Sequence, residues 1–140
     1  MTPLQTLIGC SLVPGCAEAP LLYTSEPLSF WGGYDARSGR VIDRRHRLAG
    51  QNGAGHIMAI PATRGSSTTT AVLLEAVRRG TAPVGFLTRE PDSFLALAAI
   101  VAAELYGRVL PVVALDPLDF DALRTVKRVR IEESGAVIPD

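Results

Sequence analysis

The sequence predicts an α/β fold in a single domain spanning residues 1–140. Its central part alternates short apolar runs with two longer stretches of helical pattern, which is the order strand–helix–strand–helix–strand. Glycine and proline separate nearly all of these segments, and no low-complexity linker divides the chain. A chain of 140 residues can bury a core without disulfides or metals.

Seven strands are expected, each an apolar or alternating run with turn residues around it. They are Leu4–Ile8, Leu21–Thr24, Gly55–Ile60, Pro83–Leu87, Val109–Leu115, Arg128–Ile131 and Ala136–Ile138. The order is therefore rich in strands first, then alternates strands with helices, and ends with a pair of strands.

Three helices are expected. In Thr68–Arg79 the apolar side chains form one stripe, and Gly80 is placed to end the helix. The stretch Asp92–Tyr106 stops at Gly107 and is almost wholly apolar, which predicts that it is buried. A short helix over Leu118–Leu123 follows an Asp-Pro pair that suits a helix start.

Charge and hydropathy exclude several classes of protein. Fourteen basic residues balance fourteen acidic ones and no basic stripe is present, which argues against a nucleic-acid binder. The cationic run Arg44–Arg47 is either a solvated loop, the interpretation we favour, or an anion site. The apolar run Phe94–Ala103 is too short to span a bilayer, and Leu4–Val13 lacks the basic start of a signal peptide. We therefore expect a cytoplasmic protein with no membrane partner.

Cysteine and histidine are too few for a metal centre within this chain. Cys10 and Cys16 are the two cysteines, and only His46 and His56 could add nitrogen ligands. A disulfide between the two cysteines is possible, but disulfides are rare in cytosolic proteins. We expect no metal ligand among these residues.

The turn from Arg64 to Thr70 lies between a predicted strand and a predicted helix. Backbone N–H groups at a helix start are unpaired and carry the positive end of the helix dipole, so this turn can stabilise an anion. It is a candidate active site, although Ser67 or Thr68 could simply cap the helix. In α/β units function gathers at the carboxyl ends of strands, so the segment Thr88–Glu90 is a neighbour of the site or a solvent loop.

A second segment of interest runs from Pro27 to Asp35 and holds the only tryptophan, Trp31. The pair Gly32-Gly33 permits backbone geometry that other residues rarely adopt, and close approach to a ligand or another chain. The alternative is a tight turn pinned by packing of Phe30 and Trp31. The polar stretch that continues to residue 46 is predicted to be an extended loop.

These segments, taken in order, resemble the small subunit of the aconitase X family of hydro-lyases. The residues that carry the resemblance are Ser29-Phe30-Trp31-Gly32-Gly33, Asp35, Gly39, Asp43, His46, Gly55, Arg64-Gly65-Ser66-Ser67, Leu73-Leu74-Glu75 and Ala82-Pro83. The resemblance implies the swivelling β/β/α fold of the mobile aconitase domain. It also implies a large-subunit partner that carries an iron or iron–sulfur centre, so that this chain alone binds no cofactor.

The resemblance also implies roles for individual residues. In the wider superfamily the swivelling domain supplies a serine base from a Gly-Ser-Ser turn, which corresponds here to Ser66, or to Ser67 after a shift by one. Arg64 precedes the serines, whereas ordinary aconitases have an arginine after them, and it either binds a substrate carboxylate or packs on the loop. The loop containing Ser29, Trp31 and Gly32-Gly33 would contact the substrate or the partner subunit.

Known activities of the family are dehydrations of cis-3-hydroxy-L-proline in bacteria and of mevalonate 5-phosphate in archaea. Thirteen of the fourteen basic residues are arginine, which indicates a GC-rich genome and favours the bacterial substrate. The sequence hypothesis is therefore a heterodimeric dehydratase of a small hydroxy acid. A non-catalytic swivelling module is the alternative; a serine hydrolase is disfavoured because Gly65-Ser66-Ser67 lacks a glycine two residues after the nucleophile.

Overall fold

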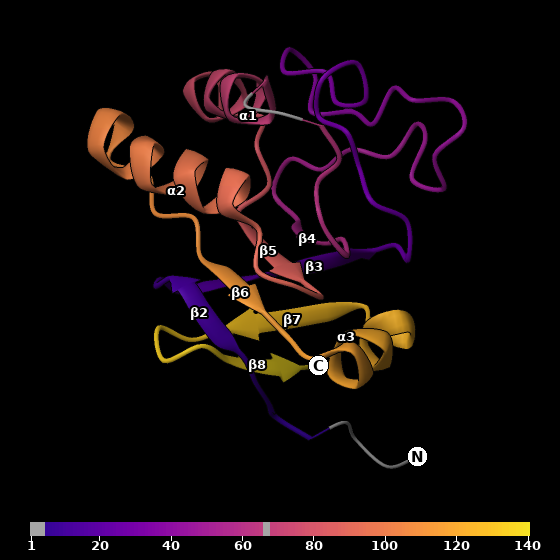
Figure 1. The fold of residues 1–140 in the computed structure, drawn as a ribbon, viewed down its shortest axis with the longest axis vertical. Coiled ribbons are helices and arrows are strands. Elements are labelled where there is room, and N and C mark those ends of the chain that lie inside the picture. Colours follow the sequence, from indigo (N-terminus) through magenta and orange to yellow (C-terminus); the bar gives the residue numbers. More distant parts are fainter. Residues whose placement is uncertain (1–4, 66–67) are drawn as a thin grey trace.

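The computed structural model describes residues 5–65 and 68–140, in which eight strands form one continuous sheet (Figure 1). The strand order is β1-β8-β7-β3-β4-β5-β6-β2. The strands are β1 (Leu7–Ile8), β2 (Cys10–Val13), β3 (Ala17–Tyr23), β4 (Ile57–Ala59), β5 (Gly85–Thr88), β6 (Val112–Ala114), β7 (Arg128–Ile131) and β8 (Ala136–Pro139). The helices are α1 (Thr68–Arg79), α2 (Ser93–Tyr106), α3 (Pro117–Ala122) and the 3-10 turn η1 (Leu123–Thr125).

The central strands β3, β4, β5 and β6 are parallel neighbours, and α1 and α2 are the connections from β4 to β5 and from β5 to β6. Strands covered on both faces are apolar throughout, and here alternate residues enter two different cores. Met58 and Phe86 face the core shared with α1 and α2. Ile57 and Leu87 face the core shared with α3, β7 and β8.

The sheet nearly closes into a barrel because its two outermost strands, β1 and β2, are consecutive in the chain. Only Gly9 separates them, and its N–H donates to the carbonyl of Gly135 at 3.2 Å. β1 pairs with β8 and β2 pairs with β6, both antiparallel. A side chain on Gly9 would begin 2.3 Å from Val113 Cγ1 and 2.8 Å from the carbonyl oxygen of Ala114, so only glycine fits at this corner.

Both long helices lie on one side of the sheet, next to each other and beside the long segment between β3 and β4 (Figure 1). The expectation that the second helix is buried is correct for only one of its faces. Leu95, Ala98 and Ala102 are buried, but Leu97 and Ile100 are about half exposed, because no further layer covers the outer face. No helix in residues 5–65 or 68–140 has the length and hydrophobicity needed to cross a bilayer.

All three predicted helices are confirmed, as are the strand order in the centre and the final strand pair. The N-terminal prediction needs correction. Of the strand expected over Leu4–Ile8, Leu4 lies outside the described residues and the described part is a strand only at Leu7–Ile8. Cys10–Val13 forms a strand that was not predicted, and β3 begins at Ala17 rather than Leu21. The first half of β3 pairs with the neighbouring strand β7, a contact between distant parts of the sequence that local patterns do not predict.

Candidate functional site

Three loops meet where the parallel strands β3, β4 and β5 end. The N–H of Thr24, just after β3, donates to the carbonyl of Ala59 at 3.0 Å. The N–H of Ile60, just after β4, donates to the carbonyl of Leu87 in β5 at 3.0 Å. The backbone ladder thus holds these strand ends in register, and the loops that follow share one edge of the sheet.

The segment Ala62–Arg64 leads into the predicted catalytic turn and is bound to the loop that follows β3. The N–H of Leu28 donates to the carbonyl of Ala62 at 3.3 Å, and the N–H of Arg64 donates to the carbonyl of Leu28 at 3.0 Å. Gly65 follows with a φ of 117°, in the region that favours glycine. The predicted base Ser66 and its alternative Ser67 lie outside the described residues, and α1 begins directly after them at Thr68.

Asp92 ties the same segment to the start of α2. One carboxylate oxygen, Oδ2, accepts from the N–H and from the hydroxyl of Thr63, both at 2.7 Å. The other, Oδ1, accepts from the N–H groups of Phe94 at 3.1 Å and Leu95 at 3.0 Å, which makes Asp92 the N-cap of α2. The residue is only 6% exposed, so a carboxylate and four donors form a buried connection between two loops.

The loop from Ser29 to Gly33 has the tight geometry that its glycines suggested. Gly32 has a φ of 76°, and a side chain on Gly33 would begin 2.0 Å from the carbonyl oxygen of Ser29. Phe30 is fully buried and anchors the loop, whereas Trp31 is 68% exposed. The packing alternative therefore holds for Phe30 and is wrong for Trp31, whose indole faces outward.

The structure brings the two predicted loops together. The Ser29 hydroxyl donates to the carbonyl of Trp31 at 3.1 Å, and a side chain on Gly65 would begin 3.8 Å from the Ser29 oxygen. Ser29 therefore lies beside the last described residue before the Ser66-Ser67 pair. The two segments are 36 positions apart in sequence and adjacent at the site.

Two cations lie on the loops around this turn. The side chains of Arg64 and Arg89 are exposed, and the N–H of Arg89 donates to the carbonyl of Pro61 at 3.1 Å, which places the β5 loop against the β4 loop. In the part of the chain that the structure describes, no ion pair includes either arginine. Together with the positive end of the α1 dipole, they give this edge the capacity to hold an anion.

The cationic run Arg44–Arg47 contains one buried residue, His46. The N–H of Leu48 donates to its Nδ1 at 3.1 Å, so Nδ1 carries no proton. Its Nε2 is 3.2 Å from the carbonyl of Pro27 and donates to it. His46 thus joins two parts of the long segment between β3 and β4, its own turn and Pro27 just before Leu28. Arg44 and Arg45 are exposed, and Arg47 pairs with Glu26 at 3.1 Å. The solvated-loop interpretation fits the arginines but not His46.

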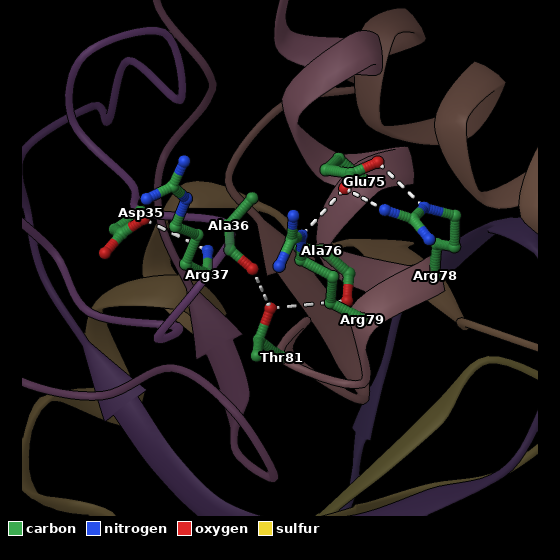
Figure 2. A network of polar contacts seen from close by, with 8 residues as sticks. All are labelled: Asp35, Ala36, Arg37, Glu75, Ala76, Arg78, Arg79 and Thr81. Carbon is green, nitrogen blue, oxygen red and sulfur yellow. Dashed lines mark hydrogen bonds and ion pairs between the residues drawn. The ribbon is translucent and has the colours of Figure 1, made fainter.

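The long segment between β3 and β4 also contacts the chain just after the C-terminal end of α1. Figure 2 shows the Thr81 hydroxyl donating to the carbonyl of Ala36 at 2.6 Å, beside Glu75 with Arg78 and Arg79. Hydrogen bonds from Arg78 and then Arg79 lower the pKa of Glu75 to about 2.

Asp35 lies next to Ala36 in the same segment between β3 and β4. The backbone N–H of Arg37 and the hydroxyl of Ser38 lower the pKa of its carboxyl. Both hydrogen bonds join residues at most three positions apart, so they shape this part of the loop locally.

Within residues 5–65 and 68–140, no three histidine, cysteine, aspartate or glutamate side chains come close enough together to hold a metal ion. Cys10 and Cys16 are both free and exposed. The described residues therefore do not fit an iron or iron–sulfur centre by themselves.

Sequence reasoning did not identify Leu28, Thr63 or the second role of Asp92. The Pro91-Asp92-Ser93 motif indicated a helix start, and the cap is observed. Nothing local signalled that the other oxygen of Asp92 reaches Thr63, because the two residues are 29 positions apart.

An α/β near-barrel in which the loops after its parallel strands meet at one edge is the swivelling class of domain. Residues 6–139 match the family model described as "Aconitase X swivel domain", so the chain belongs to this family. The predicted fold class is confirmed. The crystal structure of Thermococcus kodakaraensis aconitase X in its holo-form superimposes with a TM-score of 0.83 and 28% identity, covering 97% of this chain and 98% of that one.

Two curated relatives differ in length. Cis-3-hydroxy-L-proline dehydratase of Pseudomonas aeruginosa is 50% identical over 133 residues, 95% of this chain, and the chain spans only 23% of the length of that protein. The phosphomevalonate dehydratase small subunit of Thermococcus onnurineus is 32% identical over 132 residues, which are 94% of this chain and 95% of that subunit.

Proposed function

We propose that this chain is the small subunit of an aconitase X-type dehydratase that acts on cis-3-hydroxy-L-proline. The observation that carries the proposal is the 50% identity to the dehydratase of that name over nearly the whole chain, against 32% to the Thermococcus onnurineus subunit. The chain corresponds to 23% of the length of the former protein, and we propose that a large-subunit partner supplies the remaining functions. An iron or iron–sulfur centre, where the enzyme holds one, would be held by that partner.

Dehydration of a β-hydroxy acid begins with removal of an α-proton of low acidity. A serine can act as the base only where its alkoxide is stabilised. We assign this role to Ser66, which precedes α1 in the sequence, with Arg64 and Arg89 as cations on the flanking loops. The same cations suit a substrate carboxylate, and Ser29, beside Gly65, is assigned as a hydrogen-bond partner for the substrate.

The proposal is tested by co-expressing the chain with its large subunit and assaying cis-3-hydroxy-L-proline and mevalonate 5-phosphate in parallel. We expect turnover of the hydroxyproline by the complex and none by the rigorously purified chain alone. Preference for mevalonate 5-phosphate would support the second candidate. That candidate has one observation in its favour, a relative that is itself a separate small subunit of matching length. A complex that binds but turns over neither compound would favour the non-catalytic module.

Ser66→Ala tests the base. We expect turnover to fall by roughly 100- to 10,000-fold while complex formation is kept, because a hydroxyl is lost and little packing changes. Ser67→Ala is the matched control: as a helix cap its loss costs about 1 kcal/mol of stability and leaves most activity. Exchange of the substrate α-hydrogen with deuterated solvent measures proton abstraction directly. Exchange lost in Ser67→Ala but kept in Ser66→Ala would move the role to Ser67, and exchange kept in both would exclude a serine base.

A further inference from the structure

We infer that Asp92 is a positioning residue that fixes Thr63, in the segment leading to the Ser66-Ser67 pair, through two hydrogen bonds. The inference rests on the proposed function, in which Ser66 of that turn is the base. Asp92 lies on neither of the predicted site loops and caps a different helix.

The two oxygens of the Asp92 carboxylate have different hydrogen-bond partners and different roles. Oδ1 caps α2 by accepting from two backbone N–H groups at 3.1 and 3.0 Å. Oδ2 accepts two shorter hydrogen bonds, both at 2.7 Å and both from Thr63. Among the described residues no ion pair includes Asp92, so N–H and O–H dipoles alone stabilise its charge. A buried carboxylate held in this way has one permitted position, because any rotation leaves a donor or an acceptor unpaired.

The segment that Asp92 holds is also fixed from its other side. Leu28 exchanges two backbone hydrogen bonds with Ala62 and Arg64, which flank Thr63. Thr63 is therefore held between the β3 loop and the start of α2, three residues before Ser66. Leu28 makes these two hydrogen bonds through its backbone, so a side-chain substitution does not remove them. Asp92 is the side chain through which the position of this segment can be changed.

Asp92→Asn separates the two tasks. The amide oxygen can still cap α2, since asparagine and aspartate are both favoured caps. The amide nitrogen would then face the N–H of Thr63, a donor against a donor where a 2.7 Å bond existed, while the Thr63 hydroxyl can turn to accept from the amide. We expect kcat of the complex to fall by about 10- to 100-fold with KM little changed, because small displacements of a catalytic group reduce rates to this extent. We also expect faster deuterium exchange at the Thr63 amide.

Thr63→Val is the second variant and keeps the backbone hydrogen bond while removing the hydroxyl one. We expect a smaller loss of kcat, about tenfold, and normal assembly of the complex. The matched control is Asp116→Asn, at the N-cap of α3, where the carboxylate accepts only from the N–H of Asp119 at 2.9 Å. Its activity should equal that of the unsubstituted complex.

Two outcomes would overturn the inference. The first is a kcat per folded complex within twofold of the unsubstituted value in Asp92→Asn, which would leave Asp92 as a helix cap alone. The second is a loss of kcat in Asp116→Asn that matches the loss in Asp92→Asn. Ser66→Ala separates this inference from the proposed function. An inactive Ser66→Ala complex with a fully active Asp92→Asn complex removes only the role of Asp92, whereas a fully active Ser66→Ala complex removes the serine base and the inference together.

Discussion

Buried polar side chains hold the loops of the candidate site in place. Asp92 binds Thr63, His46 binds the carbonyl of Pro27, and the hydroxyl of Tyr34 donates to the carbonyl of Thr81 at 2.6 Å. Each joins segments far apart in sequence, and each would leave an unpaired buried group if its partner moved. At the scale of single residues, the shape of the site therefore depends on a few specific hydrogen bonds.

Tyr34 gives a prediction about alkaline pH. Burial raises the pKa of its hydroxyl above the usual value of 10.0, so above pH 10 the unfolded chain releases this proton while the folded chain keeps it. The stabilisation is fully present below pH 10 and is lost as the pH rises further. Tyr34→Phe should cost about 1 kcal/mol at neutral pH and should weaken the decline in stability above pH 10.

Urea unfolding of the wild type and of Tyr34→Phe from pH 7 to 11 measures this effect. Tyr106→Phe, at a tyrosine that is 38% exposed on α2, is the matched control. A decline above pH 10 that is equally steep with and without the Tyr34 hydroxyl would contradict the assignment.

At the scale of elements, helices were predicted better than strands because their ends are marked locally. Asp92 caps α2, Gly107 ends it with a φ of 64°, and Gly80 follows α1 with a φ of 78°. The strand Cys10–Val13 has no such marker and is defined by pairing with β6, about 100 residues later. The loop after β3 was predicted in part. Its glycines indicated a tight turn, but they did not indicate which aromatic ring would be exposed.

Trp31 carries the prediction for that loop. Since its side chain is 68% exposed, Trp31→Ala should change the free energy of unfolding of the free chain by less than about 0.5 kcal/mol. In the proposed two-chain enzyme this tryptophan lies beside the shared site, where tryptophan is a typical interface hot spot, so the affinity for the proposed large subunit should fall at least tenfold. Calorimetric titration of the two subunits and thermal melts of the free chain measure the two effects.

Phe30→Ala supplies the opposite pattern as a control. Phe30 is fully buried, and its truncation should cost about 3 to 5 kcal/mol of stability in the free chain. Unchanged subunit affinity in Trp31→Ala would place the interface elsewhere on the domain.

At the scale of the whole molecule, the prediction of a swivelling β/β/α fold came from the family resemblance, and no pattern of individual segments predicted that the sheet nearly closes into a barrel. Local patterns predicted the parallel centre, but the closure depends on β1 and β2 pairing with opposite ends of the sheet. The site has the same dependence, since Leu28, Thr63 and Asp92 meet only after β3, β4 and β5 are aligned. The sequence alone indicated the serine turn as a candidate site. It did not indicate that Leu28 and Asp92 bind the segment Ala62–Arg64 before that turn.

Gly9 is the point at which closure can be tested. Gly9→Ala would place a methyl group 2.3 Å from Val113 Cγ1 and 2.8 Å from the backbone oxygen of Ala114, and should destabilise the chain by about 1 to 3 kcal/mol through overpacking. Part of this cost belongs to the valine methyl, so the same substitution in a Val113→Ala background should cost less. A double-mutant cycle by urea unfolding measures that coupling. Additive effects of Gly9→Ala and Val113→Ala would show that the Val113 methyl does not contribute to the cost, and would leave the backbone oxygen of Ala114 as its source.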